Sequence, residues 1–131
     1  MAVTLTPTLT LVSTDATSDA LSITVTDSLS LGDNDARISQ IISPDDVNPG
    51  GTQIFDTNLG KSYIYCKNTH ASKTIWLAPA NNTATGSCWM TLAPGEFAFF
   101  PWAGNVDLYA HSGANGQGIA VAGLEYMVFE A

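Results

Sequence analysis

Residues 3–11 read Val-Thr-Leu-Thr-Pro-Thr-Leu-Thr-Leu, so that, apart from Pro7, apolar side chains hold the odd positions and threonines the even ones. This two-residue period is typical of a β-strand, because successive side chains of a strand point to opposite faces. Pro7 interrupts the pattern and predicts an edge strand or a bulge, since proline cannot donate to a strand ladder. The stretch therefore predicts a strand with one apolar face and one hydroxylated face.

The same pattern continues along the chain, and turns rich in Gly, Pro, Asn and Asp separate its repeats. A helical period of three and four residues does not recur over a useful window. Short strands at this spacing predict an all-β fold, an antiparallel β-sandwich that is jelly-roll-like, with about ten strands. Besides 3–11, the expected strands lie at 21–26, 38–42, 62–68, 74–77, 88–92, 96–100, 106–110, 119–122 and 124–129.

The length of 131 residues fits a single domain, 1–131. Aromatic residues are distributed unevenly within it, because all three Trp, all four Tyr and four of the five Phe follow residue 60. We therefore expect residues 53–131 to form the aromatic core region. Residues 1–48 are expected to form an N-terminal arm or outer strands.

The charge balance restricts the class of partner. The chain has a net charge of −8 with only four basic residues. Nucleic acids and anionic membranes both attract basic surfaces, so neither is expected as a partner. The start of the chain lacks the basic and apolar regions of a signal peptide. Residues 1–60 hold eight acids against Arg37, a net charge of −7, which either faces a basic partner or aids solubility.

Candidate catalytic groups are few. The Gly-x-Ser-x-Gly pattern of a serine hydrolase is missing from the sequence. Cys66 and Cys88 with His70 and His111 would suit a thiol–imidazole pair or a zinc site, but they lack the local spacing of either. We interpret them as two core thiols and two loop histidines, and expect no enzyme activity, no cofactor and no resident metal.

Two acidic clusters leave a calcium site open. They are the pairs Asp33 with Asp35 and Asp45 with Asp46. Carboxylates of this kind bind calcium, but the rest of a calcium loop is missing from both. Turns favour Asp because its side chain bonds to the local backbone, and this explains both pairs equally well.

The segment 92–102 carries the densest aromatic content of the chain. Pro94-Gly95 predicts a type II turn, since Gly supplies the positive φ that this turn requires. After it, Phe97 and Phe99 point to one face of the strand and Phe100 to the other, so both faces need cover. Such surfaces contact other subunits, fill a core or stack against sugars. Core or interface packing is expected for Phe97, Phe99, Phe100, Trp102 and Tyr126.

Three stretches of the second half carry a resemblance to a known family. They are YIYCKNTHASKTIWLAP (63–79), LAPGEFAFFPWAGNVDLYAHS (92–112) and LEYMVFEA (124–131). Together they resemble small virion structural proteins of tailed bacteriophages, especially marine ones. The resemblance covers about residues 62–131, and its motifs are structural rather than catalytic.

The resemblance implies a β-sandwich that assembles on the virion without enzymatic activity. We expect a capsid decoration or cement protein, located in the virion after assembly in the host cytoplasm. Its expected partners are further copies of itself, as a homo-oligomer of three, and the major capsid protein. Leu5, Leu9 and Leu11 are the expected capsid contacts of the arm. A tail, fibre or baseplate component and a carbohydrate- or receptor-binding module remain alternatives.

Overall fold

The computed structural model describes residues 3–32, 38–42, 52–79, 88–111 and 123–131. Its strands are joined by antiparallel pairing throughout these ranges, and one 3₁₀ turn, Thr57–Leu59, is the only helical element described. The all-β class and the antiparallel sheets predicted from the sequence are thereby confirmed. The chain divides into two compact units, residues 1–34 with residue 131, and residues 35–130.

The first unit is a β-hairpin that we call the N-terminal hairpin, residues 3–31. Its strands are β1 (Val3–Leu5), β2 (Thr8–Ser13), β3 (Leu21–Thr26) and β4 (Leu29–Leu31). β1 pairs with β4 and β2 with β3, and the ladder is interrupted at Pro7, as its lack of an N–H predicts. The Pro7 carbonyl accepts a hydrogen bond from the Asp27 N–H at 3.2 Å, which holds the two strands together across the interruption.

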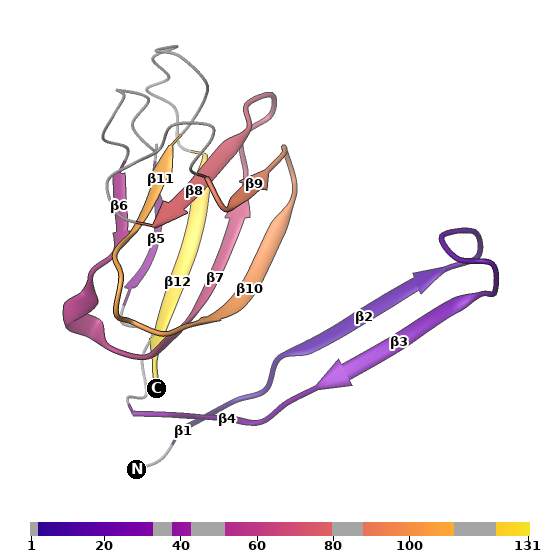
Figure 1. Ribbon diagram of the computed structural model, residues 1–131, viewed down its shortest axis with the longest axis horizontal. Helices are drawn as coiled ribbons and strands as arrows, with labels where there is room; N and C mark the ends of the chain where they lie inside the picture. Colours follow the sequence, from indigo (N-terminus) through magenta and orange to yellow (C-terminus); the bar gives the residue numbers. More distant parts are fainter. Residues whose placement is uncertain (1–2, 33–37, 43–51, 80–87, 112–122) are drawn as a thin grey trace. The chain divides into compact units, whose positions relative to one another are not determined.

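The second unit consists of two four-stranded sheets (Figure 1). Sheet 1 has the order β10-β7-β12-β5, and sheet 2 the order β6-β11-β8-β9. The strands of sheet 1 are β5 (Ile38–Ile42), β7 (Ser62–Asn68), β10 (Phe97–Trp102) and β12 (Leu124–Glu130). The strands of sheet 2 are β6 (Thr52–Phe55), β8 (Ile75–Pro79), β9 (Met90–Leu92) and β11 (Leu108–His111).

Strand pairing in the second unit is nested along the sequence. β5 pairs with β12, β6 with β11, β7 with β10 and β8 with β9. Two further pairs, β7 with β12 and β8 with β11, complete the sheets. Because β5 is an edge strand of sheet 1, residues 38–42 belong to the second unit rather than to the hairpin.

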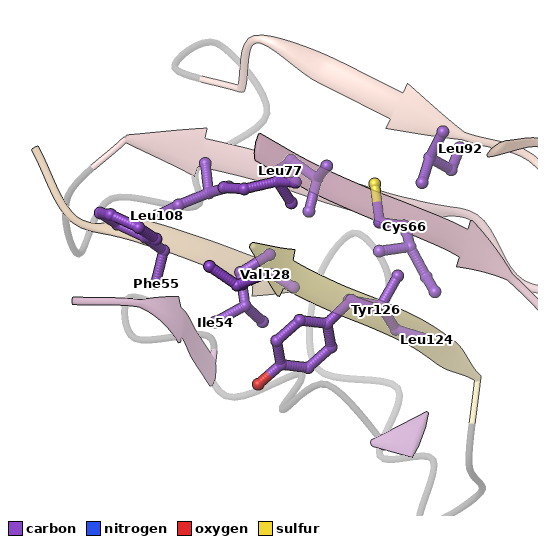
Figure 2. Close-up of a cluster of buried hydrophobic side chains, with 12 residues drawn as sticks. Ile54, Phe55, Cys66, Leu77, Leu92, Leu108, Leu124, Tyr126 and Val128 are labelled. Atoms are coloured by element: carbon purple, nitrogen blue, oxygen red, sulfur yellow. The ribbon is translucent and has the colours of Figure 1, made fainter. Parts of the chain in front are cut away.

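The core lies between the two sheets. Alternate residues of β7 and β12 are buried, which is the result of a two-residue period with one face turned inward. Figure 2 shows side chains of both sheets pointing toward one another in this cluster. The buried cluster comprises Ile54, Phe55, Ile64, Cys66, Ile75, Leu77, Leu92, Leu108, Ala110, Leu124, Tyr126 and Val128.

One buried polar side chain links both sheets at the end of this core. Asn68, the last residue of β7, is fully buried. Its amide nitrogen donates to the carbonyl of Lys73 at 2.7 Å and to that of Leu92 at 2.8 Å. Its side-chain oxygen accepts from the His70 N–H at 2.9 Å. Each polar atom of the side chain is therefore satisfied, as a buried amide requires.

Candidate interaction surface

The outer side of sheet 1 carries an unusual concentration of aromatic side chains. Strands β7, β10 and β12 each turn alternate residues away from the core, and these residues are half-buried or exposed. Phe97 is 64% exposed and Phe99 38% exposed. We call this surface the aromatic face. It comprises Tyr63, Tyr65, Lys67, Phe97, Phe99, Pro101, Glu125, Met127 and Phe129.

Strand register arranges the aromatic face in three rows across the sheet. The rows run Phe97–Lys67–Glu125, Phe99–Tyr65–Met127 and Pro101–Tyr63–Phe129. Two rows are therefore almost entirely apolar, and the charged residues lie together in the third row at one end. Directly opposed side chains of neighbouring strands lie about 5 Å apart at Cβ, so the rows form a continuous surface.

Specific contacts hold the rings of the aromatic face in place. Tyr63 and Phe99 stack with ring centroids 6.3 Å apart and planes 8° from parallel. The Lys61 ammonium lies 5.8 Å from the centroid of the Tyr63 ring, within cation–π range. The Tyr65 hydroxyl donates to Glu125 Oε1 at 3.2 Å. Partial burial, and then the neighbouring Glu125, raise the pKa of Tyr65, so its phenol stays neutral and the contact is kept.

A second group of rings lies on the inner side of β10. Phe100 and Trp102 are half-buried and pack against the core. Their ring centroids are 6.0 Å apart in an edge-to-face arrangement, and Trp102 Nε1 donates to the Val106 carbonyl at 2.9 Å. The ring centroid of Trp89, which is 68% exposed, lies 5.6 Å from that of Trp102. β10 therefore places aromatic residues on both of its faces.

The predicted packing residues thus separate into three environments. Phe97 and Phe99 lie on the aromatic face, whereas Phe100 and Trp102 pack partly against the core. Tyr126 is only 2% exposed and belongs to the core itself, so its role is internal packing. The other apolar members of the aromatic face were not predicted from the sequence. Alternation within 62–68 and 124–130 places such residues on one side of each strand, but only the strand order shows that β7, β10 and β12 are neighbours.

The N-terminal hairpin carries an apolar face of its own. Register places Leu9 opposite Val25 and Leu11 opposite Ile23, and these four side chains are between 43% and 55% exposed. Leu5, the third predicted contact, lies in β1 and is half-buried. We call the residues Leu9, Leu11, Leu21, Ile23 and Val25 the hairpin apolar face. Residues 1–34 hold four aspartates and neither Lys nor Arg, so this part of the chain is acidic.

The thiols and His70 have structural surroundings, whereas His111 lies in β11 and is buried, so the loop position predicted for His111 is wrong. Cys66 is fully buried, and that burial raises its pKa to about 12, against a smaller lowering by a backbone hydrogen bond at Ala98. Its thiolate is therefore scarce at neutral pH, and the thiolate is the nucleophilic form. Burial also raises the pKa of Cys88. His70 Nδ1 accepts from the N–H groups of Ser72 and Lys73 at 3.1 and 3.0 Å, within a turn.

The residues that the structure describes contain no group of three or more His, Cys, Asp or Glu placed to hold a metal ion. Within these ranges no helix has the length and apolar character needed to span a membrane. The pairs Asp33 with Asp35 and Asp45 with Asp46 lie outside the described residues, so their relation to calcium stays a prediction.

Comparison with known proteins found no matching family model, no matching curated protein and no matching solved structure.

Proposed function

We propose that this chain is a structural protein of a tailed-phage virion, and most specifically a capsid decoration or cement protein. The observation that carries the proposal is the presence of two distinct apolar surfaces, the aromatic face and the hairpin apolar face. Exposed contiguous apolar surface marks sites of protein association. The resemblance of residues 62–131 to phage virion proteins supplies the class of assembly.

The two surfaces suit a protein that connects neighbours. A protein that binds the assembled shell, and not its free subunits, stabilises the shell by mass action. An isolated two-stranded hairpin is only marginally stable in water, so the N-terminal hairpin gains stability when another protein covers it. Both of its long strands are also sheet edges, which can add to a sheet of a partner. We therefore assign the major capsid protein as the partner of the hairpin.

A finer assignment of the fold supports the same proposal. The eight strands from β5 through β12 pair in a nested order. We assign this connectivity to a jelly roll, in which one long hairpin is rolled into two sheets. Jelly rolls build capsid and lectin domains, among others. Because one fold serves many functions, this assignment raises the expectation of a capsid role without deciding it.

Labelling of virions tests the proposal directly. Antibodies against the chain, applied to purified particles of the phage whose genome encodes it, are expected to label the capsid in a lattice-wide pattern. Label confined to one axial position would make the chain a tail, fibre or baseplate component. Particles without label, from a preparation in which the major capsid protein is detected, would overturn a virion role.

A carbohydrate-binding module is the second candidate, and the stacked Tyr63 and Phe99 rings favour it. Exposed, flat aromatic surface also stacks against sugar rings. Saturable binding on a glycan array that Phe99→Ala and Tyr63→Ala both remove would support this candidate. Trp89→Ala serves as the matched control, since this exposed ring lies on the Trp102 side of β10 and away from the aromatic face.

A further inference from the structure

We infer that the aromatic face binds the same face of a second copy of the chain, about a two-fold axis that runs parallel to the strands between β7 and β12. This inference deepens the proposed function, on which its role in the virion rests. It names the surface through which two decoration subunits meet, and it gives two copies where the sequence led us to expect three.

Charge distribution selects a second copy as the occupant. The whole chain carries a net charge of −8, so most approaches of one copy to another bring acid against acid. The aromatic face differs, because Lys67 lies on it, Lys61 lies beside it over Tyr63, and Glu125 is its one acid. Two of the four basic residues of the chain thus serve this surface. A second acidic copy therefore meets little net repulsion at this surface.

Register then fixes the position of the axis. Lys67 and Glu125 are directly opposite each other on the adjacent strands β7 and β12. An axis between these strands lays β7 of one copy over β12 of the other. Lys67 then faces the partner's Glu125, and symmetry repeats the pair. An axis along β7 itself would instead place Lys67 over the partner's Lys67.

The same operation matches the apolar rows. Tyr65 lies over the partner's Met127, and Tyr63 lies over the partner's Phe129, each pair occurring twice. Sheets that pack face to face lie about 10 Å apart with strand directions within about 30° of each other, which suits an axis parallel to the strands. The contact is then apolar over most of its length and closed at one end by two opposite-charge pairs.

The size of the face predicts a weak pair. About this axis β10 lies over the partner's β5, so the two aromatic faces meet each other through β7 and β12. Two strands about 5 Å apart and three rows about 7 Å apart cover roughly 200 Å². Stable interfaces bury about 800 Å² from each partner, so we expect dissociation constants of about 10 µM or weaker. Weak contacts of this size become effective when subunits are already held side by side on a lattice, since the second contact is then intramolecular.

Sedimentation of the full chain tests the pairing through charge reversal. The unmodified chain is expected to show a monomer–dimer equilibrium at protein concentrations up to about 1 mM. Lys67→Glu and Glu125→Lys each place like charges opposite each other twice, so each variant alone is expected to associate at least about 10-fold more weakly. An equimolar mixture of the two variants restores both opposite-charge pairs and is expected to dimerise as a 1:1 heterodimer.

Matched controls separate this result from a change in net charge. Lys73→Glu, in the loop after β7, and Asp19→Lys, in the N-terminal hairpin, change the net charge equally and should leave dimerisation within about 2-fold of the unmodified chain. If a single variant fails to fold, the double variant Lys67→Glu, Glu125→Lys keeps the pair within its own chain. It is then expected to dimerise with itself and to be excluded from dimers with the unmodified chain, as native mass spectrometry would show.

A chain that stays monomeric at about 1 mM, that forms trimers, or whose dimers survive both single reversals would overturn the pairing. So would a mixture of the two variants that stays monomeric. These outcomes are independent of the virion experiment. A monomer that still labels the capsid would remove the pairing alone, and a dimer that is missing from the particles would remove the virion role alone.

Discussion

Single residues of the second unit combine roles that composition does not reveal. Asn68 ends the strand predicted at 62–68, and it is a buried side chain whose three hydrogen bonds reach the β7–β8 loop and β9. At Gly95 the structure agrees with a prediction made from the local sequence. The Glu96 N–H donates to the Ala93 carbonyl at 2.9 Å, and Gly95 has a φ of 85°, so the type II turn predicted from Pro94-Gly95 is confirmed.

Replacement of Asn68 tests how much this cross-link contributes. Asn68→Ala leaves the carbonyls of Lys73 and Leu92 without these donors inside the structure, and an unsatisfied buried group costs about 1–3 kcal/mol. We expect the free energy of unfolding to fall by about 2 kcal/mol or more in urea denaturation. Asn58→Ala, at an exposed position of the 3₁₀ turn, is the matched control and should change it by less than about 0.5 kcal/mol. Equal effects of the two substitutions would contradict the role of Asn68.

Burial of Cys66 makes stability depend on alkaline pH. Its pKa is about 12 in the folded chain against 9.0 for an unperturbed thiol, so above pH 9 the unfolded chain loses a proton that the folded chain keeps. The thiol therefore contributes full stability below pH 9, and that contribution falls as the pH rises toward 12. We expect the unfolding free energy of the native chain to fall more steeply between pH 9 and 10.5 than that of Cys66→Ala, by up to about 1.4 kcal/mol per pH unit. Parallel pH profiles for the two proteins would contradict a buried neutral thiol.

The positions of the strands follow from the local sequence pattern, whereas the choice of which strands pair with each other does not. Alternation at 3–11, 21–26, 62–68 and 124–129 predicts strands that the structure contains, because the two-residue period is a local property. Pairing joins β5 to β12 and β6 to β11, which are distant in sequence, and no local pattern encodes such a choice. The aromatic face depends on this pairing, since β7, β10 and β12 each contribute three of its residues. Its composition was therefore predictable and its assembly was not.

The N-terminal hairpin offers the clearest test of an element. Leu9→Thr with Leu11→Thr removes two of the five side chains of the hairpin apolar face while keeping a residue type that favours strands. We expect the double variant to lose most of its binding to purified phage shells in cosedimentation, at unchanged folding by circular dichroism. Val12→Thr, whose parent side chain is 71% exposed on the opposite face of β2, is the matched control and should bind normally. Equal binding by all three proteins would contradict a role for this face.

The whole molecule consists of two compact units that differ in packing and in charge. All twelve residues of the buried cluster come from the range 54–128, which lies inside the second unit. The buried cluster between the two sheets therefore contains no side chain of the N-terminal hairpin. The hairpin in turn is built from paired strands and their turns, and it carries three aspartates and no basic residue. Its chemistry suits a partner with an apolar centre and basic margins.

Removal of the hairpin tests whether shell binding belongs to the first unit. A chain that begins at residue 35 retains every member of the buried cluster, so we expect it to fold cooperatively, with an unfolding midpoint in urea close to that of the full chain. The same truncation removes the acidic surface and should abolish binding to shells.

Binding of the full-length chain to shells should weaken as salt rises from 0.05 to about 0.5 M, because salt screens the attraction between the aspartates of the hairpin and the basic margins expected on the partner. A truncated chain that fails to fold would show that residues 1–34 complete the sandwich. Undiminished binding by a folded truncation would move the shell contact to the second unit, where the aromatic face would be its first candidate.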